Sequence, residues 1–265
     1  MATSSTRTTK PALGLVGAVG DIFKTGQYSD LTIKCGERVW HVHKVIVCPQ
    51  SPFFARACDG GFKEAEDNTV ALKKAEDDPS VVQAMLSYLY TTEYSDEEQD
   101  QDMIPAIILN IHLHVIADKY EIPGLEKLAA SKFKKRAKKE WDTKSFADAA
   151  TLIYTSVVDR DNQLKEVVMS VATEHADALS DPASPSGAHF RRAVEAVPAL
   201  GVAVWRKYVE HVKAEKSKPK RYRCPNPSCA ISMQEDKIIN GAGGAAVCTG
   251  CGTNYYLKDW LARLV

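Results

Sequence analysis

The sequence predicts a mixed α/β protein of the α+β kind, in which short strands precede a long helical region and a small metal-dependent domain. Three observations lead to this prediction. Residues 31–35 alternate apolar and polar side chains, as a half-buried strand does. Apolar residues recur at helical spacing through most of residues 78–212. Four cysteines then stand in two close pairs near the C-terminus.

Composition limits the classes of protein that fit. The chain has 265 residues, with 34 basic and 34 acidic side chains and therefore no formal net charge. Its 45% hydrophobic and 26% charged residues are ordinary globular values, which argue against a wholly disordered chain or a polybasic nucleic-acid coat. No stretch approaches the roughly 20 apolar residues needed to cross a bilayer. We expect no membrane partner, and a location in the nucleus or cytoplasm with reduced thiols.

The first third of the chain contains the predicted strands. Gly36-Glu37 reads as a tight turn that joins residues 31–35 to a second strand at residues 39–43. Ser51 followed by Pro52 is a helix-start signal, and residues 69–72 form a further short strand. Asp78-Pro79 then opens a helix. Its apolar face consists of Val82, Met85, Leu86 and Leu89.

Charge is unevenly distributed beyond this point. Residues 91–102 hold six acids and no base, which predicts an exposed loop. The next helix, residues 103–120, is expected to present Ile104, Ile108, Ile111 and Val115 on one face. The helix after it, residues 125–137, and the two residues that follow carry a basic side that we expect to be solvated: Lys132, Lys134, Lys135, Arg136, Lys138 and Lys139. Residues 206–223 hold eight bases against two acids.

Six short motifs resemble those of the BTB/POZ domain family, and of its fungal members in particular. In chain order they are Tyr28-Ser-Asp-Leu31, Val42-His-Lys-Val-Ile-Val47, Ser51-Pro-Phe-Phe54, Gly61-Phe-Lys-Glu64, Met85-Leu-Ser-Tyr-Leu-Tyr-Thr91 and Ala117-Asp-Lys-Tyr120. The resemblance covers residues 20–139. It implies a small, mostly antiparallel sheet capped by helical hairpins, and an interaction function without catalysis. Many members are substrate adaptors that dock onto a cullin of a ubiquitin ligase, and others homodimerise in transcriptional regulators.

The resemblance also implies candidate partner-binding residues. Phe62 and Glu64 fit the hydrophobic-x-Glu signature of cullin-binding members, in which the ring is an anchor and the carboxylate a nearby polar partner. The alternative for this segment is a solvated loop. Asp30 and Lys44 match a charged pocket near the family's dimer interface, and we favour the alternative that they form an internal ion pair. His43 should lie on the strand face of Val39 and His41 and be hydrogen-bonded in or near the core.

Dimerisation in this family depends largely on an N-terminal helix. Here that helix would cover Leu13 to Lys24. Gly14, Gly17 and Gly20 each weaken it by about 1 kcal/mol relative to alanine. A homodimer through the BTB domain therefore stays an open expectation.

The C-terminal cysteines predict a structural zinc site. Cys224 and Cys229 form a C-x4-C pair, and Cys248 and Cys251 follow 18 residues later as a C-x2-C pair, a pattern that resembles a four-cysteine zinc ribbon. Residues 221–265 are too few for a dependable core of their own, whereas one zinc ion contributes on the order of 10 kcal/mol. Two disulfides are the alternative, which a reducing compartment disfavours. Four thiolates leave no open position, so we expect no catalytic zinc.

These observations predict five segments: a disordered tail and the start of the first helix at 1–19, a BTB/POZ domain at 20–139, a helical extension at 140–213, a basic linker at 214–220 and a zinc-ribbon-like domain at 221–265. The leading hypothesis is a non-enzymatic adaptor that brings an unknown client protein to a cullin. The alternative is a transcriptional or chromatin-associated regulator that contacts nucleic acid through residues 206–265. We expect no enzyme, because no nucleophile elbow, metalloprotease motif or phosphate loop is present.

Overall fold

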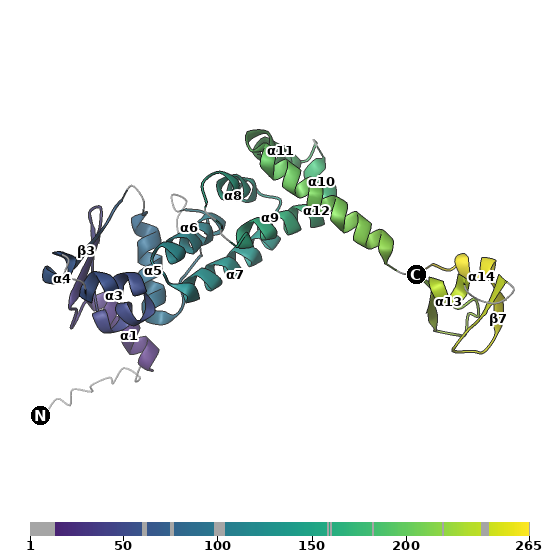
Figure 1. Cartoon of the computed structure of the whole chain (residues 1–265), viewed down its shortest axis with the longest axis horizontal. Helices are drawn as coiled ribbons and strands as arrows, with labels where there is room; N and C mark the ends of the chain where they lie inside the picture. The colour runs from purple at the N-terminus through teal and green to yellow at the C-terminus, as the bar shows by residue number, and fades with distance from the viewer. Residues whose placement is uncertain are drawn as a thin grey trace, which may run out of the picture. The chain divides into compact units, whose positions relative to one another are not determined.

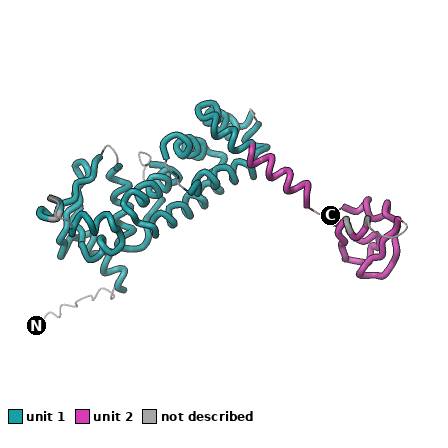
Figure 2. Tube along the Cα trace, viewed as in Figure 1, with its two compact units in different colours: residues 1–205 teal, residues 206–265 magenta. Residues whose placement is uncertain are grey.

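The structure of the chain is a computed structural model. It describes residues 14–59, 63–74, 77–97, 104–157, 159, 161–181, 183–218, 220–239 and 244–264. Most of the predicted disordered tail, residues 1–13, therefore lies outside the described residues. The chain divides into two compact units, residues 1–205 and residues 206–265 (Figure 2). None of the described helices has the length and apolar character needed to cross a membrane.

A three-stranded sheet forms one layer of the N-terminal unit (Figure 1). The central strand β1 (Leu31–Cys35) pairs antiparallel with β2 (Arg38–Val42) and parallel with β3 (Thr69–Leu72). Gly36 adopts a φ of +58° in the tight turn between β1 and β2, a conformation that favours glycine. Leu31, Ile33 and Cys35 point into the core, as their alternation in the sequence predicts. The described sheet is therefore mixed, with one antiparallel and one parallel pairing.

In the described part of this region, six short or medium helices accompany the sheet. They are α1 (Leu15–Thr25), α2 (Lys44–Val47), the 3-10 helix η1 (Cys48–Gln50), α3 (Pro52–Asp59), α4 (Lys63–Glu66) and α5 (Pro79–Thr91). The two predicted helix starts are confirmed, because the hydroxyl of Ser51 accepts the N–H of Phe54 at 3.2 Å and the carboxylate of Asp78 accepts the N–H of Ser80 at 2.7 Å. The predicted apolar face of α5 is buried in the first core.

Two long helices, α6 (Ala106–Lys119) and α7 (Pro123–Glu140), are shared between two cores. Leu113 and Ile116 of α6 belong to the core of the sheet, whereas Ile107 and Ile111 belong to a second, purely helical core. The predicted single apolar face of α6 is therefore wrong in part. Val115, assigned to it, is 38% exposed, because α6 is buried on two sides by different neighbours.

The predicted solvation of the basic side of α7 is also wrong in part. Lys132 and Arg136 turn toward the acidic segment, where Lys132 pairs with Glu93 and the Nε of Arg136 lies 3.0 Å from the carboxylate of Asp96. The remaining predicted lysines of this side, Lys134, Lys135, Lys138 and Lys139, are exposed. Residues 98–102 of the acidic segment lie outside the described residues.

The second core is completed by helices that follow the BTB-like region. They are α8 (Lys144–Thr155), α9 (Gln163–Glu174), α10 (Ala176–Ser180), α11 (Pro185–Ala196) and α12 (Pro198–Ser217). Phe146 and Phe190 stack in this core with ring centroids 6.2 Å apart. The helix break expected near Pro198 separates α11 from α12. Helix α12 includes the first four residues of the segment predicted as a linker.

Within residues 220–264, the described strands form two small antiparallel pairs. Strand β4 (Arg221–Arg223) pairs antiparallel with β5 (Ser232–Gln234), and β6 (Ala245–Val247) pairs antiparallel with β7 (Asn254–Tyr256). Two five-residue helices follow these pairs, α13 (Glu235–Ile239) and α14 (Leu257–Leu261). Trp260 is fully buried at the centre, and its indole N–H donates to the carbonyl of Ala246 at 3.3 Å.

Candidate metal centre and partner-binding residues

The structure brings the four predicted zinc ligands together. Cys224 directly follows β4 and Cys248 directly follows β6, so each strand pair supplies one of the two cysteine-bearing turns. The Sγ atoms of Cys224 and Cys251 lie 3.7 Å apart, as do those of Cys229 and Cys248. All four sulfurs lie within 4.8 Å of one another, and all four are free thiols rather than disulfides.

These distances fit a tetrahedral metal site. With zinc–sulfur bonds of about 2.3 Å, neighbouring sulfurs of a regular tetrahedron are about 3.8 Å apart. A disulfide would need sulfurs about 2.05 Å apart. The four-thiolate donor set suits zinc among common ions, and four protein ligands would complete its shell. Cys224, Cys229, Cys248 and Cys251 would therefore hold one structural ion.

Backbone N–H groups donate hydrogen bonds to two of the sulfurs, and the pKa values of two thiols are shifted. The N–H of Asn226 donates to the Sγ of Cys224, and the N–H of Gly250 donates to the Sγ of Cys248, both at 3.4 Å. The backbone N–H and the hydroxyl of Thr253 lower the pKa of Cys251 to about 6. Burial raises the pKa of Cys224 to about 12, so that thiol would release its proton only when a cation binds.

Two glycines of the second turn are required for different reasons. Gly252 has a φ of +70°, which residues with a side chain rarely adopt. Gly250 is required by close packing, because an added Cβ would lie 2.3 Å from Cγ1 of Ile231 and 3.2 Å from the Sγ of Cys229. The second turn thus approaches the first too closely for any side chain at position 250.

The aromatic residues of this domain are mostly structural. Tyr222 is 4% exposed and Trp260 is fully buried, and both pack with Cys224 and Cys248 in one small core. Tyr255 meets Trp260 edge-on, with ring centroids 6.1 Å apart. Tyr256, in contrast, is 66% exposed.

The predicted cullin-binding residues can be placed only in part. Phe62 lies outside the described residues. Glu64 lies in α4, close before β3, and is exposed to solvent. Its carboxylate is therefore accessible to a partner.

Asp30 and Lys44 meet, but through the backbone of the lysine. The N–H of Lys44 donates to the carboxylate of Asp30 at 2.7 Å, whereas the ammonium of Lys44 donates to the side-chain carbonyl of Asn68. The carboxylate thus holds the start of α2 against the segment before β1. No ion pair between the two side chains occurs among the described contacts.

His43 is buried and hydrogen-bonded, but its predicted strand face is wrong. Val39 and His41 are exposed on β2, whereas His43 lies past the end of that strand and is 4% exposed. Its Nε2 lies 2.6 Å from the carbonyl of Gln27, and its Nδ1 lies 2.7 Å from the hydroxyl of Tyr90. The strand ends at Val42, so alternation does not extend to position 43.

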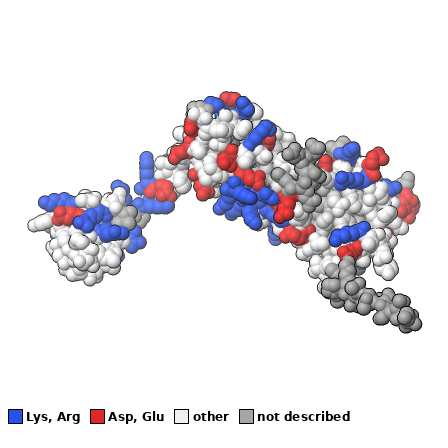
Figure 3. Space-filling view, turned by 180° about the vertical axis from the view of Figure 1, so that it is seen from behind, with Lys and Arg blue, Asp and Glu red and all other residues white. Residues whose placement is uncertain are grey.

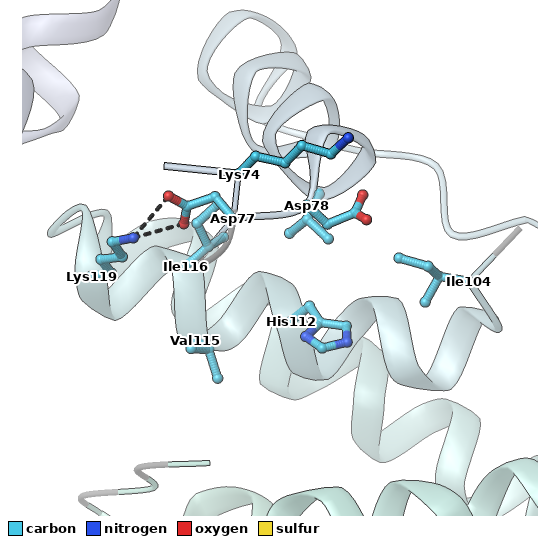
Figure 4. A pocket seen from close by; sticks show the side chains of 9 residues that line it. Lys74, Asp77, Asp78, Ile104, His112, Val115, Ile116 and Lys119 are labelled. Carbon is cyan, nitrogen blue, oxygen red and sulfur yellow. Dashed lines mark hydrogen bonds and ion pairs between the residues drawn. The ribbon is translucent and has the colours of Figure 1, made fainter. Parts of the chain in front are cut away.

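A groove beside α6 was not indicated by the sequence (Figure 4). Its volume is about 330 Å³, and its lining consists of Lys74, Asp77, Asp78, Val81, Ile104, His112, Val115, Ile116 and Lys119. The buried carboxylate of Asp77 accepts from the Nζ of Lys119 at 2.8 and 2.9 Å and from the hydroxyl of Tyr120 at 2.8 Å. These bonds join the segment before α5 to the end of α6.

Comparisons with known proteins concern the N-terminal unit. The BTB/POZ domain family matches residues 19–137. Protein germ cell-less of Drosophila melanogaster is 31% identical over 100 residues, which is 37% of this chain and 17% of that protein. Kelch-like protein 40 of Mus musculus is 28% identical over 117 residues, 44% of this chain and 17% of that protein. The chain thus spans about a sixth of the length of these curated relatives.

A solved structure, the BTB domain of zebrafish PATZ1, aligns with 50% of this chain and 99% of its own length. Its identity is 14% and its TM-score 0.37, so this alignment carries no argument of its own. From the family match, residues 19–137 have the BTB/POZ fold, and members of that family are in general modules for contacts between proteins.

Proposed function

We propose that this chain is a substrate adaptor of a cullin-type ubiquitin ligase. The BTB domain would dock onto the cullin, and the rest of the chain would recruit the client protein. The observation that carries this proposal is the continuity of the BTB domain with the helices after it. Because α6 and α7 contribute to both cores, the helices α8–α11 extend the BTB domain as one compact body.

Glu64 supports the same proposal. It stands exposed in α4 at the position of the hydrophobic-x-Glu signature, with Phe62 two residues before it in the sequence. Aromatic side chains that bury in a pocket of the partner supply much of the binding energy of protein interfaces.

Co-purification with a cullin tests the proposal. We expect the wild-type chain to retain a cullin and the double variant Phe62→Ala/Glu64→Lys to lose it. Glu66→Lys is the matched control, because Glu66 is also exposed in α4 and its replacement makes the same change in charge. Absence of a cullin from the wild type, or equal retention by the double variant, would contradict this mechanism.

A second candidate function is a transcriptional or chromatin-associated regulator. The observation in its favour is the excess of eight bases over two acids in residues 206–223. Affinity purification followed by mass spectrometry distinguishes the candidates, since it identifies client proteins and ligase subunits, or chromatin proteins, without assuming either. Recovery of neither set would reject both functions.

A further inference from the structure

Three arginines lie together at the edge of the metal-binding domain. Arg221 and Arg223 are exposed at both ends of β4, on either side of the buried Tyr222. The N–H of Arg223 donates to the carbonyl of Arg263 at 2.8 Å, and Tyr222 forms a bridge with Leu264, so the C-terminal segment runs beside β4. Arg263 is exposed as well. We call Arg221, Arg223 and Arg263 the arginine face.

The burial of Tyr222 determines which side of β4 its neighbouring side chains face. Tyr222 packs in the small core, and its hydroxyl donates to the carboxylate of Glu235 at 3.1 Å. Alternation along the strand then forces Arg221 and Arg223 to the outer side. The small core with the four cysteines therefore lies on one side of this short strand, and the arginine face lies on the other.

No ion pair joins the arginine face to an acidic side chain among the described contacts. Across the strand pair, Arg221 stands opposite Gln234 and Arg223 opposite Ser232, which are neutral side chains. None of the three arginines takes part in a described ion pair. Arg223 lies beside Arg263 on the neighbouring segment, and an anionic ligand between them would offset their repulsion.

The spacing of the arginines favours a ligand with regularly repeated phosphate groups, such as the backbone of a nucleic acid. Arg221 and Arg223 are two residues apart on a strand and hence about 6.8 Å apart along it. Lys220, which precedes this row in the sequence, is also exposed. Figure 3 shows Lys and Arg gathered on one side of this unit, with an acidic group among them. Arginine binds phosphate oxygens in a bidentate manner. A regular row of such groups suits a repeating backbone better than a single phosphorylated side chain.

The burial of the aromatic residues indicates whether the nucleic-acid ligand is single-stranded or a duplex. Proteins that bind single strands stack the bases on exposed rings. Tyr222 and Trp260, the aromatics nearest the face in sequence, are 4% and 0% exposed. The exposed Tyr256 lies in β7, which pairs with β6 in a different sheet from β4. We propose that the arginine face binds the phosphate backbone of duplex nucleic acid without reading its sequence. This inference rests on the second candidate function, a transcriptional or chromatin-associated regulator, and assigns its nucleic-acid contact to Arg221, Arg223 and Arg263.

Fluorescence anisotropy with the full zinc-loaded chain and a labelled 20-base-pair duplex tests the proposal. With four backbone contacts, from the arginine face and Lys220, the slope of log K against log salt should be about −3.6. The triple variant Arg221→Gln/Arg223→Gln/Arg263→Gln should lose at least tenfold in affinity at 50 mM salt and have a slope of about −0.9. Its zinc content and circular dichroism should match the wild type.

The matched control is Lys127→Gln/Lys134→Gln/Lys138→Gln, which removes three exposed lysines from α7 and makes the same change in net charge. It should bind as the wild type does. Equal loss in both triple variants would overturn the assignment of the face while leaving nucleic-acid binding in place. Tighter binding of a single strand of the same sequence would overturn the duplex ligand. No binding by the wild type at 50 mM salt would reject the second candidate function itself.

Discussion

The imidazole of His43 shows how one residue can join three separate segments. A carbonyl only accepts hydrogen bonds, so in the neutral ring the proton lies on Nε2, toward Gln27. Nδ1 then accepts from the hydroxyl of Tyr90, whose oxygen also accepts the backbone N–H of His43 at 2.7 Å. The segment before β1, the start of α2 and helix α5 are thereby connected through one buried side chain.

Removal of the Tyr90 hydroxyl should be costly. Tyr90→Phe leaves the backbone N–H and Nδ1 of His43 without their partner in the core, and we expect a loss of about 1–3 kcal/mol in the free energy of unfolding. Urea denaturation measures it. Tyr88→Phe is the control, since no hydrogen bond of that hydroxyl occurs among the described contacts, and it should change stability by less than about 0.5 kcal/mol. Equal effects would contradict the proposed role of the Tyr90 hydroxyl.

Gly250 provides a test of how the two cysteine turns fit together. Gly250→Ala should reduce zinc affinity at least tenfold, because its Cβ would push against Ile231 and the sulfur of Cys229. A competition assay with a coloured chelator measures the affinity. The added change Ile231→Ala should restore part of it.

The matched comparison is Gly252→Ala, whose Cβ would meet nothing within 4 Å. The loss in the free energy of zinc binding comes from the positive φ alone and should be about 1 kcal/mol. Ile231→Ala should not relieve it. If both glycine variants respond alike to Ile231→Ala, steric contact is not the reason for glycine at position 250.

At the scale of elements, the acidic segment after α5 is attached to α7 by Asp96. Burial would raise the pKa of Asp96, but hydrogen bonds from Arg136 and Asn110 outweigh burial and lower that pKa. The pKa of the carboxyl is thus lower in the folded chain than the value of about 3.9 in an unfolded chain. Its stabilising contribution is present above that value and is lost as the pH falls through the folded pKa.

Asp96→Asn should therefore destabilise the chain by about 1.5–3 kcal/mol at pH 7, and the difference from wild type should shrink below about pH 4. Urea denaturation at several pH values measures this. The control is Asp148→Asn in α8, where the pair with Lys144 is exposed and contributes about 0–1 kcal/mol. A difference that stays constant down to pH 3 would show that the charge of Asp96 is not responsible.

Local signals in the sequence predicted the elements well, and contacts across the sequence explain where prediction failed. The caps at Ser51 and Asp78 involve neighbouring residues, so a short window reveals them. The spacing of the cysteines within each close pair is likewise visible in a short stretch of sequence, and it was sufficient to predict the site of four sulfurs. The contact of Arg136 with Asp96 joins residues 40 positions apart, which a single sequence does not reveal. Helix α6 lies between two cores, so its burial follows from its neighbours rather than from its own periodicity.

At the scale of the whole molecule, the described chain has two kinds of core. In residues 1–205, the two cores share α6 and α7, and each depends on apolar burial by many side chains. In residues 206–265, the core contains few apolar residues, and two of its buried members are the candidate metal ligands Cys224 and Cys248. The two units should therefore respond differently to loss of metal.

Zinc removal should unfold residues 220–264 and leave the BTB domain folded. We expect one zinc ion per chain, absent from the variant Cys248→Ser/Cys251→Ser, and a loss on the order of 10 kcal/mol in the stability of the ribbon. Hydrogen exchange with mass spectrometry should show faster exchange in β4–β7 after chelation and unchanged exchange in α5 and α6. The same chelator should have no effect on the double serine variant. Protection that persists in β6 and β7 without metal would mean that this small core is stable without an ion.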